Sequence, residues 1–216
     1  MAGVREICRV GWTCFRGAPL PTRLLMTARP LICPLDVAAQ AVPAGSHVLD
    51  VGCGAGLWLR WLVRDRGIAS GVGVDVSAKA IALAATCAAG EDALRFEHLE
   101  TESAWPAGSF EVVTAIDVLH HVPPEAQRPF VAALAGKARR RVVLKDLAPT
   151  PRWRAWANAL HDFLMTRSRV YPRPMDEVAE WFRESGLTIV RAERVHRACY
   201  SHYLVVADRK TEHPAS

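Results

Sequence analysis

An α/β fold with a three-layer, doubly wound sheet is the class that the sequence predicts, on three observations. Short apolar runs rich in Val and Ile alternate with segments of helical periodicity. A glycine-rich turn joins one of these runs to a helix, and two runs near the C-terminus follow each other without a helix between them. Strands that alternate with helices form a parallel sheet covered on both faces, whereas two directly consecutive strands pair as an antiparallel edge.

Seven apolar runs are long enough to be strands. The expected strands cover 48–51, 72–76, 93–97, 112–116, 142–144, 188–192 and 203–207. Their β-branched residues suit strands that are buried on both faces.

Helical patterns fill the intervals between these strands. A helix is expected over 57–66, and Ser77 is a suitable N-cap for an Ala-rich helix that Gly90 ends. Residues 124–135 predict another helix, which Pro129 is expected to kink or to delay. Amphipathic spacing predicts two more helices, over 153–164 and between Pro174 and Gly186.

The chain has the size of one domain with a full apolar core: 216 residues, of which 50% are hydrophobic and 23% are charged. Residues 1–45 are expected to form a partly helical N-terminal extension, and residues 46–209 the catalytic domain. Within this domain, residues 147–186 would form a helical lid. Residues 210–216, after the domain, would form a flexible tail.

Charge and cysteine usage narrow the possible function classes. The net charge of +5 suits acidic partners but is too diffuse to choose among them. Six scattered cysteines without a C-x-x-C pair predict no metal site and no disulfide framework. No run predicts a transmembrane segment or a signal peptide, so we expect a cytoplasmic protein; the oligomeric state stays open.

The most informative stretch runs from the strand at 48–51 through a glycine-rich turn into the helix at 57–66. The glycines Gly52, Gly54 and Gly56 allow a tight turn and a close approach of the backbone to a ligand at the N-terminus of that helix. Asp75 ends the next strand, where a carboxylate can accept two hydrogen bonds from a ribose diol.

Two details favour S-adenosylmethionine over a dinucleotide as the ligand of this turn. The glycine spacing is G-x-G-x-G rather than the G-x-G-x-x-G that seats a pyrophosphate. Asp50 precedes the first glycine, where its charge would repel a pyrophosphate and attract the ammonium group of a methionine moiety. The simpler alternative is a tight strand–helix turn without a ligand.

These motifs resemble those of the class I S-adenosylmethionine-dependent methyltransferases. Residues 48–56 and 71–77 are similar to the first two motifs of that superfamily, and 110–123 to its fourth-strand motif. The resemblance covers roughly 45–207 and implies a Rossmann-like sheet of seven strands in the order 3-2-1-4-5-7-6, with strand 7 antiparallel. It implies S-adenosylmethionine as cofactor and these binding residues: Asp50, Gly52, Cys53, Gly54, Gly56, Asp75, Val76, Glu100, Thr101 and Asp117.

Two of these positions have alternatives. Glu100-Thr101 matches the acidic residue and neighbour that hold the adenine amine in the family, but this chain has Leu99-Glu100 where the family more often has Gly-Asp. Glu can accept the same hydrogen bond; the alternative is a solvated glutamate in a loop. In the family, Asp117 lines the site beside the methionine moiety, but here it could instead cap the helix that follows.

Methyl transfer is an in-line displacement that requires a base only when the accepting atom carries a proton of high pKa. The candidates for catalysis are His120, His121, Asp146 and His161, of which the first three lie near the carboxyl ends of strands. Each has a structural alternative: a histidine bonded to the backbone, or an ordinary Lys145–Asp146 ion pair. Tyr200, His202 and Tyr203 are interpreted as mostly structural.

The predicted reaction is methylation of a small aromatic or hydrophobic acceptor at an oxygen atom. Aromatic side chains between 153 and 182 would suit such an acceptor, and nearby arginines could meet a carboxylate or a carrier phosphate. Leu31–Pro34, Lys145–Leu147 and Asn158–Asp162 are also similar to small bacterial methyltransferases associated with aryl-polyene pigment pathways, which would imply an aromatic hydroxyl acceptor.

Three other function classes are alternatives to methylation of a small molecule. The cluster Lys137, Arg139, Arg140 and Arg141 suggests a nucleic-acid (RNA) methyltransferase, but residues 116–119 lack the Pro-Pro-Tyr type motif that stacks a flipped base, and the basic cluster would rather cap the turn before 142–144. The glycine spacing argues against an NAD-dependent oxidoreductase, and the intact acids argue against a non-catalytic scaffold.

Overall fold

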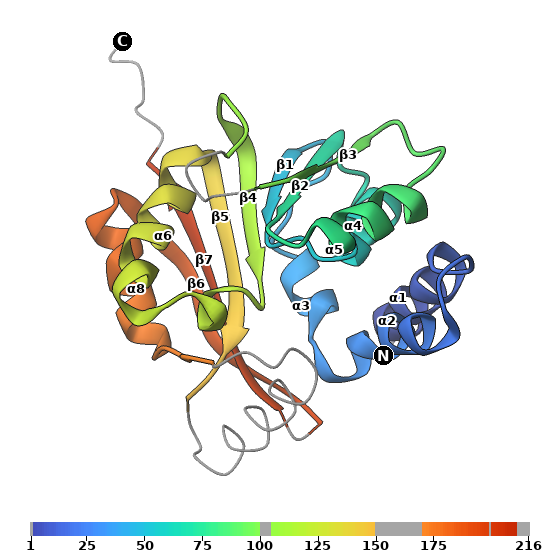
Figure 1. The fold of residues 1–216 in the computed structure, drawn as a ribbon. Helices are drawn as coiled ribbons and strands as arrows, with labels where there is room; N and C mark the ends of the chain where they lie inside the picture. Colours follow the sequence, from blue (N-terminus) through green and yellow to red (C-terminus); the bar gives the residue numbers. More distant parts are fainter. Residues whose placement is uncertain (1, 100–104, 150–169, 199, 211–216) are drawn as a thin grey trace.

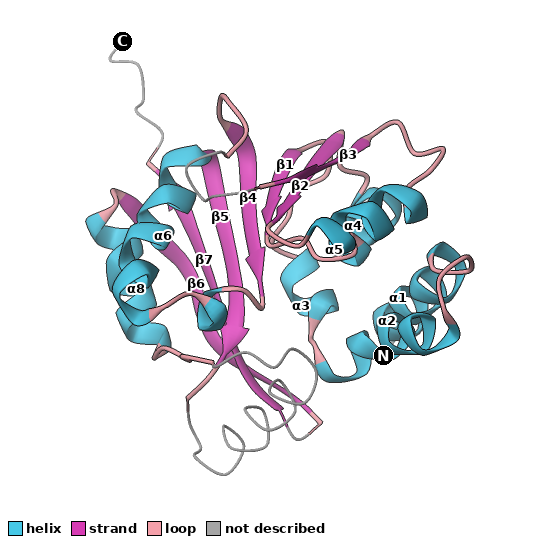
Figure 2. Cartoon of the chain, viewed as in Figure 1, coloured by secondary structure: helices cyan, strands magenta, loops and turns pink. Residues whose placement is uncertain are grey.

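A computed structural model describes residues 2–99, 105–149, 170–198 and 200–210. Its centre is a seven-stranded sheet in the order β3-β2-β1-β4-β5-β7-β6 (Figures 1 and 2). The strands β1 to β5 are parallel, and β7 runs antiparallel to both β5 and β6. The expected sheet order and the antiparallel strand 7 are confirmed.

All seven expected strands are present. They are β1 (His47–Val51), β2 (Ser70–Asp75), β3 (Leu94–His98), β4 (Phe110–Ile116), β5 (Ala138–Leu147), β6 (Leu187–Arg197) and β7 (Tyr200–Arg209). Neighbouring residues of β1 point to opposite faces of the sheet, so that Leu49 joins one apolar core and Val48 the other. Burial on both faces explains why these strands read as continuous apolar runs.

Helices cover both faces of the sheet. They are α1 (Ala2–Cys14), α2 (Leu20–Ile32), α3 (Leu35–Ala39), α4 (Leu57–Arg66), α5 (Ala78–Cys87), the short 3₁₀ helix η2 (Leu119–His121), α6 (Pro124–Lys137) and α8 (Met175–Glu184). The core that includes Leu49 is packed by α6 and α8, whereas α1, α3 and α4 pack the core that includes Val48. Figure 1 shows these two groups on opposite sides of the sheet.

The helix predictions hold, with small shifts at the ends. Ser77 caps α5, because its side chain accepts a hydrogen bond from Ala80 N at 3.3 Å; the helix ends at Cys87, ahead of Gly90. Pro129 neither delays nor ends α6, which begins at Pro124 and continues to Lys137. The expected helix over 153–164 lies outside the described residues.

The basic cluster before the fifth strand needs a correction. Arg139, Arg140 and Arg141 do not cap a turn, since β5 begins at Ala138 and includes them. Arg141 donates two hydrogen bonds to Asp208 of β7, at 2.6 and 2.8 Å, and Arg140 pairs with Glu111 of β4 at 3.2 Å. These cross-strand partners let a charged segment extend the strand.

The N-terminal extension is mostly helical where the structure describes it. The helices α1 and α2 form a hairpin, and Gly11 allows their close contact: a Cβ there would lie 3.0 Å from Met26 O. At the other end of the predicted lid, α8 packs against α6, β6 and β7. The helix α8 therefore belongs to the layer that covers the sheet. A lid stays a prediction for the part of 147–186 that precedes α8.

A buried glutamine fixes the segment that follows β4. The Nε2 group of Gln127 lies 3.1 Å from Leu119 O, 3.1 Å from Val122 O and 2.8 Å from Tyr171 O. Its Oε1 accepts a hydrogen bond from Arg173 Nε. Gln127 is fully buried, so it satisfies carbonyl groups that water does not reach. The turn that carries η2 is thereby tied to α6 and to the loop before α8.

We expect Gln127→Leu to lower the free energy of unfolding by about 2 kcal/mol or more, because an apolar side chain of similar size leaves buried carbonyls without donors. Urea unfolding measures this change. Arg128→Ala is the matched control on the same helix, since its exposed ion pair with Glu184 contributes less than about 1 kcal/mol. Equal losses in the two variants would contradict this role of Gln127.

Candidate active site

The glycine turn after β1 is held tightly against the end of β2. Gly52 and Cys53 both donate their backbone N–H groups to Val74 O, at 2.8 and 3.0 Å. Gly52 and Gly56 have φ angles of +73° and +79°, a conformation that other residues rarely adopt. Gly56 also leaves room for the ring of Phe96, which a Cβ would approach to 2.7 Å. The turn therefore requires glycine at these two positions.

Asp75 ends β2 beside this turn. Its carboxylate accepts hydrogen bonds from Gly54 N and from Ser77 N, both at 2.8 Å. The next residue, Val76, is 68% exposed. The predicted sugar-binding carboxylate is thus positioned by two backbone donors and lies partly open to solvent, with an exposed apolar neighbour.

Asp50 lies in the middle of the sheet and is buried. Its Oδ1 accepts a hydrogen bond of 2.6 Å from the Thr114 hydroxyl of β4, and that hydroxyl accepts one of 3.1 Å from Trp58 Nε1. Burial raises the pKa of Asp50 to about 7. Among the described residues no cation lies within ion-pair distance of this carboxylate. A cationic ligand would therefore stabilise its charged form.

A small cavity of about 20 Å³ lies between the glycine turn and α2. It is lined by Met26, Arg29, Leu35, Asp50, Gly52, Cys53, Ala55, Leu57, Trp58 and Ile116. The cavity brings a carboxylate, Asp50, and a guanidinium group, Arg29, to one space. Asp75 is not among its lining residues.

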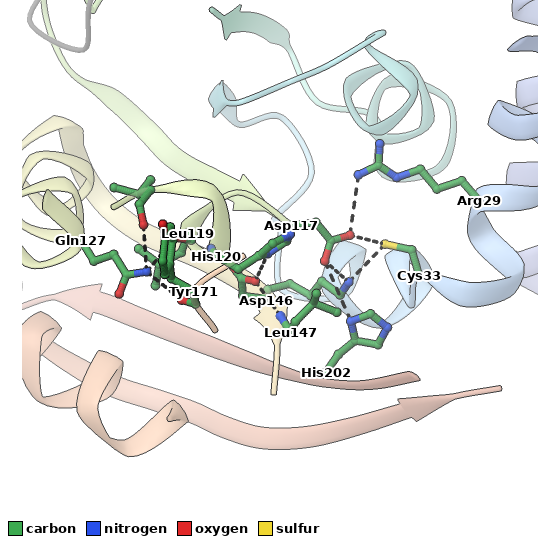
Figure 3. Close-up of polar contacts among 12 residues, drawn as sticks. Arg29, Cys33, Asp117, Leu119, His120, Gln127, Asp146, Leu147, Tyr171 and His202 are labelled. Carbon is green, nitrogen blue, oxygen red and sulfur yellow. Dashed lines mark hydrogen bonds and ion pairs between the residues drawn. The ribbon is translucent and has the colours of Figure 1, made fainter. Parts of the chain in front are cut away.

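Beyond the cavity, a polar cluster surrounds Asp117 (Figure 3). The carboxylate accepts hydrogen bonds from Lys145 Nζ and from the Cys33 thiol, the latter at 3.0 Å. Arg29 lies 3.6 Å from the same carboxylate and His202 Nδ1 lies 3.9 Å away. Asp117 has a φ of +58° and caps no helix with its side chain; its side chain instead binds these partners.

The charged groups in this cluster shift one another's pKa values. Burial favours the protonated form of Asp117, but the charges of Lys145, His202 and Arg29 hold the pKa of Asp117 well below its usual range. Burial, followed by the charge of Lys145, lowers the pKa of His202 to about 4. Burial and the charge of Asp117 raise the pKa of the Cys33 thiol to about 11. At neutral pH the cluster therefore holds an ionised Asp117 and a neutral Cys33 thiol.

His120 and Asp146 form a second buried pair next to this cluster. Asp146 accepts hydrogen bonds from His120 Nδ1 and from His120 N, the latter at 3.2 Å. Its Oδ1 also accepts one of 2.6 Å from Leu147 N. Both side chains are at most 3% exposed. Because Nδ1 is bonded to a carboxylate, neutral His120 carries its proton on Nδ1.

The structure brings together many of the predicted residues. Asp50, the glycines, Cys53 and Asp75 gather at the ends of β1 and β2, while Asp117, His120 and Asp146 gather at β4 and β5. Asp146 lies inside β5 rather than after a strand ending at 144. His121 is exposed, with its ring centre 4.1 Å from that of His120. Glu100, Thr101 and His161 lie outside the described residues.

Four residues of this region were not predicted as site residues. Arg29 and Cys33 come from the N-terminal extension and contact Asp117. Lys145, which the sequence suggests as a partner of Asp146, contacts Cys33 instead, and His202, which the sequence suggests is structural, lies near Asp117. The Lys145-Asp146 pair carries the one local signal: two charges at the end of an apolar strand. Arg29, Cys33 and His202 are distant in sequence from Asp117, and only the folded sheet brings them together.

Comparison with known proteins identifies the family. A family model described as a methyltransferase domain matches residues 28–192. The ubiquinone biosynthesis O-methyltransferase of Xanthomonas axonopodis pv. citri is 28% identical over 163 residues, which cover 71% of this chain and 67% of that protein. The protein of the same name from Psychrobacter cryohalolentis is 42% identical over 86 residues, 38% of this chain and 34% of that protein. The match thus spans only about a third of the Psychrobacter relative.

Solved structures share the fold. Magnesium protoporphyrin IX methyltransferase from Synechocystis PCC 6803, crystallised with bound S-adenosylmethionine, has a TM-score of 0.64 and 24% identity, and covers 82% of this chain and 78% of its own. An O-methyltransferase family protein from Burkholderia thailandensis has a TM-score of 0.70 and 18% identity, and covers 88% and 58%. On the match over 28–192 and the sheet order, the chain belongs to the methyltransferase domain family, within the class I S-adenosylmethionine-dependent methyltransferases.

Proposed function

We propose that this chain transfers a methyl group from S-adenosylmethionine to a hydroxyl oxygen of a small aromatic or hydrophobic acceptor. The observation that carries the proposal is the buried His120–Asp146 pair, which lies at the carboxyl ends of β4 and β5, the edge of the sheet at which α/β enzymes bind ligands. The relatives named ubiquinone biosynthesis O-methyltransferases support transfer to oxygen. The narrower likeness to aryl-polyene enzymes stays a prediction.

The residues around the cavity fit the amino-acid end of S-adenosylmethionine. Asp50 is a buried carboxylate with no described cation within ion-pair distance, which suits an α-ammonium group, and Arg29 on the same cavity suits an α-carboxylate. Asp75 would accept hydrogen bonds from the ribose, with Val76 beside the base. Since Met26 and Arg29 of α2 lie over a cavity of about 20 Å³, we expect α2 to move when the cofactor enters.

When bound, S-adenosylmethionine supplies an activated methyl group on a sulfonium leaving group. The contribution of this chain is then alignment of the acceptor and removal of its proton. His120 Nε2 would take the hydroxyl proton, while Asp146 holds the ring and stabilises the imidazolium that forms. Asp117 and Lys145 provide a fixed pair of charges beside this step.

The basic cluster no longer supports the hypothesis of an RNA methyltransferase. Three of the four cations that suggested it bind within the chain: Arg140 to Glu111, Arg141 to Asp208, and Lys137 to Pro106 O at 2.6 Å. A methyltransferase domain also does not support an NAD-dependent oxidoreductase.

Asp75→Ala should raise the Kd for S-adenosylhomocysteine about 100-fold or more, since two hydrogen bonds to a charged acceptor are lost. Isothermal titration calorimetry measures this change. Asp65→Ala removes an exposed carboxylate from α4 and serves as the control, with unchanged affinity. Wild-type affinity in Asp75→Ala would refute the site as described.

Affinity for S-adenosylhomocysteine should also depend on pH through Asp50. The raised pKa of about 7 means that acid protonates this carboxylate in the free chain, whereas a bound ammonium group favours its ionised form. The affinity should therefore rise up to tenfold per pH unit below about pH 7 and level off above it. Titrations across this range test the sign, and Asp50→Asn should bind weakly with a flat profile. A wild-type affinity that falls as the pH rises would contradict the assignment.

His120→Gln should lower kcat about 100-fold with a panel of phenolic acceptors, while the Kd for S-adenosylhomocysteine changes little. Asp146→Asn should lower kcat in the same direction and change the pH profile, because an amide no longer stabilises the imidazolium. Release of S-adenosylhomocysteine reports turnover. Exposed His121→Gln is the matched neighbour and tests the second predicted histidine. If His120→Gln turned over like wild type, His120 would not be the base.

A further inference from the structure

The outer face of the α1–α2 hairpin carries large apolar side chains that are substantially exposed. On α2, Leu20, Leu24 and Leu31 are 60%, 51% and 55% exposed. Their spacing of four and seven residues places them on one stripe of the helix, and Ala28 between them is also exposed. Trp12 of α1 is 41% exposed. We call these side chains the apolar stripe.

The same hairpin is basic. Residues 1–32 contain five arginines and one acid, Glu6, a net charge of +4 out of the +5 of the whole chain. Arg5 and Arg9 lie on the exposed side of α1, and Arg16 lies exposed in the turn between the helices. With Trp12, Arg5 and Arg9 share one stripe at intervals of four and three residues. Positive charges thus flank the apolar stripe.

The hairpin is well anchored, so the exposed stripe is not a frayed end. Ile7, Val10 and Phe15 of its inner side belong to the core that includes Val48. Arg23 links the two helices at the outer side: its guanidinium carbon lies 3.5 Å from the centre of the Trp12 ring, and its Nε donates a hydrogen bond of 2.9 Å to Trp12 O. Figure 1 shows the hairpin at the periphery of the molecule, away from α6 and α8.

We propose that the outer face of the α1–α2 hairpin docks on the surface of an anionic phospholipid bilayer. Leucines and a tryptophan on the exposed side of a helix, with arginines beside them, match the pattern by which amphipathic helices lie in a membrane interface. The arginines would meet lipid phosphates while the leucines enter the boundary of the acyl chains. No helix of the described part is both long and apolar enough to cross a bilayer, so the contact is peripheral.

Two other occupants fit the observations less well. A second copy of the chain would bring two hairpins of charge +4 together, and their repulsion opposes a self-complementary contact. RNA would meet the arginines but would leave Leu20, Leu24 and Leu31 in contact with water or phosphate. The combination of apolar and positive side chains favours lipid.

Docking would also place the cavity near the lipid surface. Met26 and Arg29 project from α2 into the cavity, whereas Leu24 and Leu31 lie on the exposed side of the same helix. A hydrophobic acceptor that partitions into lipid would therefore be close to the site. Lipid binding itself does not depend on the proposed methyl transfer, so either proposal can fail while the other stands.

The experiment is co-flotation of the full chain with vesicles of phosphatidylcholine, with or without phosphatidylglycerol. We expect binding to anionic vesicles that is at least about tenfold stronger than to neutral ones and that weakens as salt is raised. One triple variant removes apolar side chains: Leu20→Ser, Leu24→Ser and Leu31→Ser. A second removes charge: Arg5→Gln, Arg9→Gln and Arg16→Gln. Each should lower binding about tenfold or more, with wild-type thermal unfolding because these side chains are exposed.

Matched controls remove the same kinds of group elsewhere. The charge control replaces three exposed cations: Arg64→Gln, Lys79→Gln and Arg139→Gln. The apolar control is Val190→Ser, a residue that is 52% exposed on β6. Both should bind vesicles like wild type. Binding of the hairpin variants at the level of the controls would overturn the proposal, as would a wild-type chain that ignores anionic vesicles but dimerises or binds RNA through the hairpin.

Discussion

Three carboxylates, Asp50, Asp117 and Asp146, lie in or just after the neighbouring strands β1, β4 and β5, and the arrangement of the site depends on how each of them is neutralised. Asp117 is paired with Lys145, and Asp146 with His120. Asp50 receives only a hydroxyl hydrogen bond from Thr114, and burial raises its pKa to about 7. An ionised carboxylate out of water needs a compensating charge, so the site contains two internally balanced acids and one that a cationic ligand would balance.

This balance explains why the N-terminal extension belongs to the site. Arg29 reaches Asp117 from α2, and Cys33, just after that helix, donates to the same carboxylate. His202 reaches the cluster from β7 and holds the end of α2 through a hydrogen bond of 2.9 Å with Ile32 O. The extension is therefore joined to the sheet by polar contacts at the site as well as by the apolar core that includes Phe15.

The fold could be predicted to within a few residues because its signals are local. Val- and Ile-rich runs, the Ser77 cap and Gly186 after α8 each act within a few positions of the chain. Two elements differ from the prediction, and one of them depends on distant partners. Arg139–Arg141 extend β5 because Glu111 and Asp208 lie on neighbouring strands, and α6 tolerates Pro129 near its N-terminal end.

The residues of the candidate site also divide into those that a local motif predicts and those that only distant contacts bring together. The glycine turn, Asp50 and Asp75 follow from one motif and the strand after it, and could be read from spacing alone. Cys33 lies 84 positions from Asp117, and Ile32 lies 170 positions from His202. No local pattern reports such contacts. Cys33 reaches Asp117 because the chain after α2 lies at the end of β4, and His202 reaches Ile32 because β7 inserts between β5 and β6 and places its first residues beside the end of α2.

The helix α2 shows how one short segment can serve two surfaces. A 13-residue helix that packs one side on a core usually has polar residues on its solvent side. The solvent side of α2 instead has leucines, and Arg29 is directed inward to Asp117. This inverts the usual order, in which charge faces water and apolar groups face the core. The inward arginine is accounted for by the buried acids, whose charge it compensates. No described residue accounts for the outward leucines in this way. The anionic bilayer proposed above would complement a surface that is apolar and lies near arginines.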